Sequence, residues 1–412
     1  MKILQINKFY HEKGKSGGTG RYLFSLIQLL ESRGHQIEIF SMQDENTLSS
    51  PYSPYFVKKQ DFSTPKISLR NLGRLIKFIY SFEAKRNIKQ LIKNEKPDIV
   101  HIHNIYHHIT PSILSVLKKY HLPVVQTLHD FHLISPNYNL FFKNSPHETC
   151  SHGKYWKAIV HKCIKNSRFA SMLVAVKMYF EKISRVYLKN VDFFIAPSEF
   201  LKKKYLENKF PAQKIIAIKP FVDAGMYLPN FSPGNYALYF GRLHAQKGLD
   251  ILIDAFRELP HIPLKIVGTG EEKENLLRLI KKEKINNIEL VGPKYGKQLE
   301  EIIKNSAFVI VPSLSYENAP FAVLESFALG KPVIASNLGG LPELIKDNET
   351  GLLFNAGDKK DLKEKILKLY QSPWLIKIMG HKARLLIEQN FSPNTHYQAL
   401  MAIYQRALIK KL

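Results

Sequence analysis

The stretch that most constrains the fold spans residues 308–343 and reads FVIVPSLSYENAPFAVLESFALGKPVIASNLGGLPE. It begins with a short apolar run of strand-forming residues, which a proline ends, and residues 322–329 then have helical spacing before a glycine. A second strand is predicted over residues 332–337, followed by a Gly-Gly turn. A strand, a helix and a second strand in this order predict a parallel sheet with helices packed on its faces.

Two glutamates in this stretch are candidate ligand-binding residues. Glu317 stands just before the predicted helix and Glu325 lies within it. A carboxylate in the loop after a parallel strand points into the crevice at the carboxyl ends of the strands, where open α/β sheets bind ligands. Isolated glutamates are more often solvated surface charges. Small and apolar residues flank Glu325, and this setting favours a ligand site.

The rest of the chain alternates in the same way, which predicts a doubly wound α/β fold. A chain of 412 residues exceeds the size of most single cores, so two domains are expected. A long helix is predicted from about residue 67 to residue 93. Further short strands are predicted at residues 2–7, 36–42, 98–104, 123–130 and 192–200.

Glycine-rich and cationic turns follow several of these strands. Gly17 and Gly18 precede a helix, where backbone N–H groups can approach an anion, although a purely structural loop explains them as well. Arg242 and Lys247 lie in a strand-to-helix turn. A diphosphate is best met by guanidinium, ammonium and helix N-terminal N–H groups together, whereas such cations are otherwise usually solvent-facing.

His129 and Asp130 end another predicted strand, and His103 ends the strand before it. If the fold is doubly wound, these side chains face the ligand crevice. A lone histidine in such a place is more often structural than catalytic.

Several of these segments together resemble retaining nucleotide-sugar glycosyltransferases of family four, which have the GT-B fold of two Rossmann-like doubly wound domains facing across a cleft. The resemblance rests on E-x7-E from Glu317 to Glu325 with GKPVIAS and GGLPELI after it, on G-R-x4-K-G at 241–248, and on TLHDFHLISP around His129. It implies an acceptor-binding domain over residues 1–212, a nucleotide-sugar-binding domain over residues 213–390 and a terminal helix, residues 391–412, that crosses back to the first domain.

The resemblance also implies roles for individual residues. Arg242 and Lys247 would neutralise the departing diphosphate, Glu317 would position or stabilise the sugar, and His129 would hold a sugar hydroxyl. Glu325 would accept hydrogen bonds from the ribose. The remaining donor-binding residues would be Gly17, Gly18, Gly268, Val291, Asn318, Ala319, Pro320 and Phe321. The expected donor is a UDP- or GDP-sugar, and neither a cofactor nor a divalent metal is expected in the reaction.

The charge is concentrated in the first half of the chain. Residues 1–210 hold 33 Lys and Arg against 15 Asp and Glu, and so carry +18 of the net +25. This excess predicts an anionic partner. Lysines that alternate with Trp156, Ile159 and Val160 predict a basic amphipathic helix near residues 154–168, although a solvated helix packed by its apolar stripe explains them as well.

These features together predict a cytoplasmic protein on the inner face of the cytoplasmic membrane, acting on a saccharide or lipid-linked acceptor. The N-terminus lacks a signal peptide's long apolar core, and no run of about 18 apolar residues occurs. A basic nucleic-acid-binding protein is the rival from another class, but the chain has no zinc-finger, helix-turn-helix or RNA-recognition signature, and no nucleic-acid partner is expected. An inactive sugar-binding homologue is the second rival, although every donor motif position is filled.

The two cysteines lie close to histidines, in Cys150-Ser-His152 and His161-Lys-Cys163. These four side chains could hold a tetrahedral Zn²⁺. Ordinary zinc sites use C-x2-C or H-x3-H spacing, so surface or packing roles are the favoured interpretation and metal binding stays an open alternative.

Overall fold

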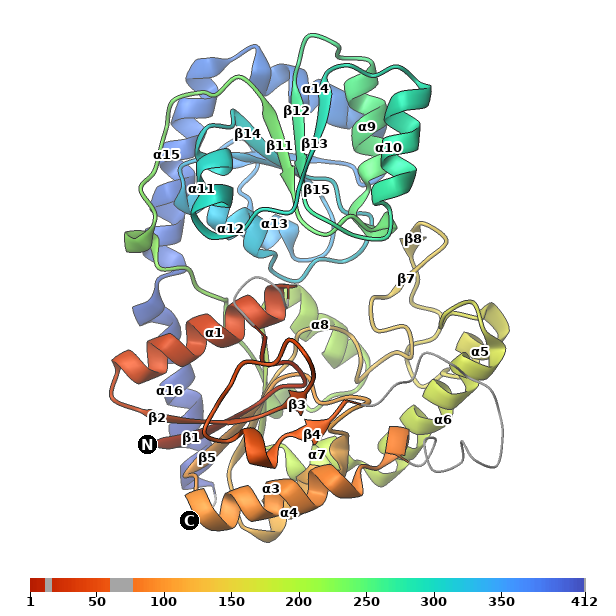
Figure 1. Ribbon diagram of the computed structural model, residues 1–412, viewed down its shortest axis with the longest axis vertical. Coiled ribbons are helices and arrows are strands. Elements are labelled where there is room, and N and C mark those ends of the chain that lie inside the picture. Colours follow the sequence, from red (N-terminus) through yellow and green to blue (C-terminus); the bar gives the residue numbers. More distant parts are fainter. Residues whose placement is uncertain (12–16, 60–76, 411–412) are drawn as a thin grey trace. The chain divides into compact units, whose positions relative to one another are not determined.

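The computed structural model describes residues 1–11, 17–59 and 77–410, and the chain divides into two compact units. The first unit comprises Met1–Tyr138, Glu148–Ile218 and His396–Leu412; the second comprises Asn139–His147 and Lys219–Thr395. Each unit is built on a six-stranded parallel sheet with helices on both faces (Figure 1). The predicted fold class of two Rossmann-like doubly wound domains is therefore confirmed.

The first sheet has the strand order β10-β9-β6-β5-β1-β2. Its strands are β1 (Lys2–Ile6), β2 (Gln36–Phe40), β5 (Ile99–Ile102), β6 (Val124–Thr127), β9 (Phe193–Ala196) and β10 (Ile215–Ala217). β5, β9 and β10 are near-continuous apolar runs, which is typical of strands covered on both faces, whereas β1, β2 and β6 each contain two polar residues. Because β10 pairs with β9, the first unit extends to Ile218 rather than ending at the predicted residue 212.

Eight α-helices of the described residues pack in this unit or end in it. They are α1 (Gly17–Ser32), α3 (Phe82–Glu95), α4 (Leu114–Lys119), α5 (Lys157–His161), α6 (Arg168–Ser184), α7 (Val186–Asn190), α8 (Glu199–Glu207) and α16 (Pro393–Ile409). Two short strands complete its elements, β3 (Met42–Gln43) and β4 (Val57–Lys58). Two more, β7 (Phe141–Phe142) and β8 (Ser145–Pro146), form a hairpin in the segment that belongs to the second unit.

Two predicted helices differ from the structure. Of the helix predicted over residues 67–93, residues 67–76 lie outside the described residues, and α3 begins only at Phe82, because the Ser81 hydroxyl accepts a hydrogen bond from the Ala84 N–H and caps it. The single basic helix predicted near residues 154–168 is wrong. The structure has a short helix, α5, that ends at His161, and α6 begins only at Arg168. Lys162, Lys165 and Asn166, between the two helices, adopt the left-handed conformation that ends a helix.

The second sheet has the strand order β13-β12-β11-β14-β15-β16. Its strands are β11 (Ala237–Phe240), β12 (Leu264–Val267), β13 (Ile288–Gly292), β14 (Phe308–Val311), β15 (Val333–Ser336) and β16 (Gly351–Phe354). The helices are α9 (Leu249–Arg257), α10 (Lys273–Lys282), α11 (Gly296–Lys304), α12 (Phe321–Ala328), α13 (Leu341–Leu344), α14 (Lys359–Tyr370) and α15 (Pro373–Asn390).

Alternate residues of these strands build two cores, one on each face of the sheet. Phe308 and Ile310 pack with α9 and α14, whereas Val309 and Val311 pack with α12 and α15. This period of two follows from the pleat of a strand, which sends successive side chains to opposite faces. The sheet is thereby covered by packed side chains on both faces.

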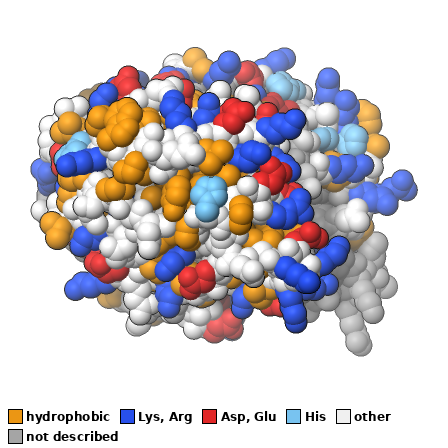
Figure 2. Space-filling model, turned by 90° about the horizontal axis from the view of Figure 1, so that it is seen from above, with side chains coloured by type: hydrophobic (Ala, Val, Ile, Leu, Met, Phe, Trp, Pro, Cys, Tyr) orange, Lys and Arg blue, Asp and Glu red, His pale blue; other side chains and the backbone are white. Residues whose placement is uncertain are grey.

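The surface is mixed in charge where it is seen in Figure 2. Lys and Arg side chains lie among Asp and Glu side chains and apolar groups on this face. Within the described ranges, the helices are all too short or too polar to cross a bilayer.

Candidate functional site

The second sheet has a topological switch point between β11 and β14, which are neighbours although two strands separate them in sequence. Chain connections leave in opposite directions on the two sides of such a point, and ligands of open α/β sheets bind in the crevice that results. Lys247 lies in the turn after β11, and Glu317 lies in the loop after β14. The two side chains predicted to meet the donor therefore come from the two loops at this point.

Close backbone packing holds these two loops together. Gly248 has φ +66°, and a Cβ there would lie 2.0 Å from the carbonyl oxygen of Pro312, so the position requires glycine. The Leu314 N–H donates to the Gln246 carbonyl at 2.8 Å. On the far side, the Gly340 N–H donates to the Glu317 carbonyl at 2.6 Å, which ties the loop to the Gly-Gly turn after β15.

Lys247 and Glu317 form an ion pair between the ammonium and Oε1. The Ser313 hydroxyl donates to the same carboxylate oxygen at 2.7 Å. Burial alone would raise the pKa of Glu317, but the charge of Lys247 and the two hydrogen bonds outweigh it and lower that pKa. Glu317 is therefore ionised at neutral pH, with an ammonium beside it in the crevice.

Arg242 adds a second cation to the turn after β11. Its side chain is exposed, and its guanidinium makes no ion pair with any residue in the described ranges. The turn also contains His244, which the sequence interpretation missed. Its Nδ1 accepts a hydrogen bond from the Gln246 N–H at 3.2 Å, and its Nε2 lies 2.7 Å from a carboxylate oxygen of Glu271. His244 therefore connects this turn to the loop after β12.

Gly268, which was predicted to contact the donor, packs against the glycines that end the two neighbouring strands. A Cβ on Gly268 would lie 1.8 Å from the carbonyl oxygen of Gly241, and the Gly268 N–H donates to the Gly292 carbonyl at 3.0 Å. Val291 is half-buried beside Gly292 at the end of β13. The ends of three adjacent strands thus present backbone rather than side chains to the crevice.

The predicted donor-binding residues around α12 lie in one continuous segment. Asn318, Ala319, Pro320 and Phe321 are half-buried between Glu317 and the start of the helix. Glu325 is 9% exposed within α12. Its contact with a ribose stays a prediction.

Gly17 and Gly18 belong to the first unit, where they begin α1 and are exposed. Gly17 has φ +65°, which favours glycine. Their predicted contact with the donor stays a prediction, since the other donor residues lie in the second unit.

Histidines dominate the carboxyl ends of the strands in the first unit. His129 Nε2 lies 3.0 Å from His103 Nδ1, and His103 Nε2 lies 2.9 Å from the side-chain oxygen of Gln5. The ring of Tyr22 on α1 packs edge-on against both imidazoles. Burial lowers the pKa of His129 to about 3, so this imidazole is neutral at physiological pH.

A cluster of polar side chains surrounds Asp130, the residue after His129, and the sequence predicted only part of it. Asp130 accepts hydrogen bonds from the Tyr106 hydroxyl and from the His132 N–H, and Lys8 Nζ lies 4.5 Å from the centre of the Tyr106 ring. Burial raises the pKa of Asp130. Among these residues the sequence interpretation named only Asp130. His132 lies within the TLHDFHLISP phrase, which is the signal that could have found it.

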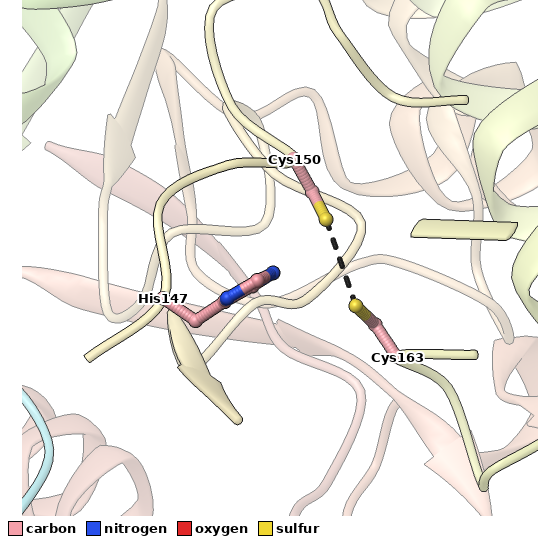
Figure 3. A group of neighbouring side chains, drawn as sticks. All are labelled: His147, Cys150 and Cys163. Atoms are coloured by element: carbon pink, nitrogen blue, oxygen red, sulfur yellow. Dashed lines mark hydrogen bonds between the residues drawn. The ribbon is translucent and has the colours of Figure 1, made fainter. Parts of the chain in front are cut away.

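Of the predicted Cys/His cluster, the structure brings Cys150 and Cys163 together, with their sulfurs 3.6 Å apart (Figure 3). His152 and His161 do not join them. The third member of the group is His147, which the sequence interpretation did not consider.

Comparisons with known proteins identify the family of the chain. The family model of glycosyltransferase family 4 matches residues 16–225, and the model of glycosyl transferases group 1 matches residues 228–386. An uncharacterized glycosyltransferase of Methanocaldococcus jannaschii is 27% identical over 93% of this chain and 92% of its own length. A 42.6 kDa protein in the cps region of Klebsiella pneumoniae is 26% identical over 84% of this chain and 88% of its own.

Among solved structures, HepE of Anabaena in complex with UDP and glucose superposes with a TM-score of 0.69 at 19% identity, covering 98% of this chain and 100% of that one. This likeness shows the shared fold. With one family model spanning half of the chain and the second most of the remainder, the chain belongs to glycosyltransferase family 4 and is a GT-B glycosyltransferase.

Proposed function

We propose that the protein transfers a sugar, with retention of configuration, from a UDP- or GDP-sugar to a lipid-linked saccharide acceptor during assembly of a bacterial surface polysaccharide. The observation that carries the donor assignment is the Lys247–Glu317 ion pair at the switch point, with exposed Arg242 in the same turn. Two cations and one ionised carboxylate in a rigid crevice suit a ligand that joins a diphosphate to a polyhydroxyl group.

The two cations stabilise the leaving diphosphate in this proposal. Negative charge develops on the diphosphate as the bond to the sugar breaks, and preorganised donors at that position lower the barrier. Lys247 is held in place by Glu317 before any ligand binds, so little reorganisation is needed. The first N–H groups of α9 follow in the same turn and favour an anion as well. A divalent metal is not required for this charge neutralisation.

The carboxylates and the histidine bind hydroxyl groups. Glu317 is ionised and accepts hydrogen bonds from the transferring sugar, while Glu325 accepts them from the ribose. His129 is neutral, and a neutral imidazole can both accept and donate a hydrogen bond to a sugar hydroxyl. No side chain is assigned as a covalent nucleophile.

The nature of the acceptor is supported by a relative and by the surface. The Klebsiella pneumoniae protein takes its name from a cps region. HepE, which was solved with UDP and glucose, supports the donor rather than the acceptor. In the first unit, α6 presents exposed apolar side chains at helical spacing, namely Met172, Val176, Phe180 and Ile183. Trp156 and Val160 at α5 are exposed too.

Exposed cations flank this apolar surface. Lys162, Lys165 and Arg168 precede or begin α6, and Lys182 and Arg185 lie at its end. An apolar stripe bordered by lysines and arginines matches an anionic bilayer, since the apolar side chains enter the interface and each cation near an acidic leaflet contributes about 1 kcal/mol. We therefore place the protein at the inner face of the cytoplasmic membrane, where a lipid-linked acceptor is found.

A thermal-shift screen over UDP-, GDP- and ADP-sugars tests the donor assignment. A ligand present at 100 times its dissociation constant adds about 2.7 kcal/mol to the free energy of unfolding, so one nucleotide series should raise Tm clearly. The same series should give slow donor hydrolysis or, with an acceptor, transfer. A chain that no nucleotide sugar stabilises would contradict the proposal, and stabilisation without any turnover would favour an inactive sugar-binding homologue.

A further inference from the structure

The cysteine pair and His147 form a side-chain cluster that the transfer reaction does not use. We propose that Cys150, Cys163 and His147 bind one Zn²⁺ ion with a structural role. Figure 3 shows the two sulfurs facing each other and the imidazole pointing toward them. One ligand atom from each of the three residues lies within 4.8 Å of the other two.

The spacing of the sulfurs fits a metal site. Tetrahedral zinc with Zn–S bonds of about 2.3 Å holds two thiolates about 3.8 Å apart. The observed Sγ–Sγ distance is 3.6 Å, which is far longer than the ~2.05 Å of a disulfide. Two thiolates and one imidazole are a ligand set that selects zinc over magnesium or calcium, which prefer oxygen ligands.

Two polar side chains close to the cysteines in sequence contact other groups. Glu148 is the nearest carboxylate in sequence to Cys150, but both of its oxygens accept hydrogen bonds from Lys204, at 2.9 and 3.0 Å. The His152 imidazole lies 2.6 Å from the Ser151 hydroxyl. In this proposal a water molecule completes the tetrahedron, because these residues supply three protein ligands whereas structural zinc sites usually have four.

The local structure explains why a metal would be useful here. Cys163 lies in a turn between α5 and α6 where Lys162, Lys165 and Asn166 all adopt left-handed conformations. Among the described residues, the apolar cluster next to this turn has four buried members, Tyr155, Val174, Ala175 and Met178. A core that small stabilises its surroundings weakly, and metal ligation commonly supplies the rest.

Metal binding on tag-free, full-length protein tests this proposal. After removal of metal with a chelator, Zn²⁺ titrated back should bind at one ion per chain, measured by competition with a chromophoric chelator, and should raise Tm. Co²⁺ in its place should give a thiolate-to-metal charge-transfer band. Cys163→Ser should weaken zinc binding by more than about 100-fold and lower the intensity of the band by about half or more, and His147→Gln should weaken binding by about tenfold.

Matched controls lie in the same segment. His152→Gln and His161→Gln remove the two histidines that the structure leaves outside the cluster, and both should bind zinc as the wild type does. Cys150 is fully buried, so Cys150→Ser risks a folding defect, whereas Cys163 is half-buried and its variant keeps the test decisive. Circular dichroism of each variant checks folding.

Three results would overturn the proposal. One is the absence of stoichiometric zinc binding by the wild type. The second is an equal loss of affinity in His152→Gln or His161→Gln. The third is a Cys150–Cys163 disulfide found by mass spectrometry in protein purified with a thiol reductant present, since oxidised sulfurs cannot act as thiolate ligands.

Discussion

The two units place opposite chemistry at the carboxyl ends of the same kind of sheet. In the first unit the strand ends present the buried imidazoles of His101 and His103 and the half-buried imidazole of His129, which are linked to one another or to neutral partners. In the second unit they present an ion pair, Lys247 with Glu317. A common sheet therefore does not determine the electrostatic character of its binding end; the side chains in the loops do.

The physical cause of the difference is whether a counter-charge accompanies burial. Burial lowers the pKa of both His101 and His129 to about 3, because an imidazole removed from water is disfavoured in its charged form. Burial acts on Glu317 as well, but the ammonium of Lys247 reverses its effect. The first arrangement suits neutral hydroxyl groups, and the second suits a charged diphosphate.

Of the predicted effects, the largest should be the loss of turnover when a cation of the second unit is removed. Arg242→Ala or Lys247→Ala should each lower turnover by about two orders of magnitude, because each removes a charged donor to the leaving group. Initial-rate measurements at saturating donor check this. The matched control is Lys273→Ala, an exposed lysine at the start of α10, which should keep wild-type turnover. Wild-type rates in the Arg242 or Lys247 variant would contradict the donor assignment.

The two glutamates of the second unit should separate catalysis from binding. Glu317→Ala should lower kcat about tenfold or more with nucleotide affinity nearly kept, whereas Glu325→Ala should weaken nucleotide binding about tenfold, because one contacts the sugar and the other the ribose. Calorimetry with free UDP and GDP on both variants measures the nucleotide affinity. If Glu317→Ala abolished nucleotide binding and Glu325→Ala left it intact, the assigned roles would be exchanged.

Acid should destabilise the first unit before the second. His101 and His129 bind protons near pH 6.5 when unfolded but only near pH 3 when folded, so the contribution of these two histidines to the stability of the first unit is complete above pH 6.5 and falls as the pH drops. The pKa of Glu317 is lowered by folding, so its stabilising contribution is kept above its ordinary value of 4.5 and is lost only below it.

Hydrogen exchange followed by mass spectrometry at pH 7, 6 and 5 distinguishes the two units. Peptides from β5 and β6 should lose protection first, and those from β11 and β14 later. His101→Gln, which removes one titrating group, should flatten the pH dependence of the first unit. Simultaneous loss of protection in both units would contradict the proposed electrostatic difference.

Membrane binding should show the smallest effects and should depend on the first unit alone. Changing Lys157, Lys162 and Lys165 to Glu should lower sedimentation with acidic vesicles about tenfold, and Phe180→Ser with Ile183→Ser should lower it several-fold. The control is Trp374→Ser, an apolar residue of the second unit that is 64% exposed, which should leave binding unchanged. Equal sedimentation with neutral and acidic vesicles, or none with either, would remove the membrane proposal alone.

Much of the fold could be predicted because it is encoded locally. Continuous apolar runs such as 308–311 read as buried parallel strands, and the structure places β14 there. The helix predicted over residues 322–329 is α12, which begins one residue earlier and ends one residue earlier. The boundaries of α3, α5 and α6 could not be predicted, since a serine cap and a few left-handed residues decide them.

The sequence by itself determined the residue types at the strand ends, because polar groups and glycines interrupt apolar runs there whatever the rest of the chain does. Only the tertiary structure decided which of them meet. Lys247 and Glu317 are 70 residues apart and pair because β11 and β14 are neighbours in the sheet. His147 joins the two cysteines, and His152 does not, because the path of a loop rather than spacing in sequence sets the distances between ligand atoms.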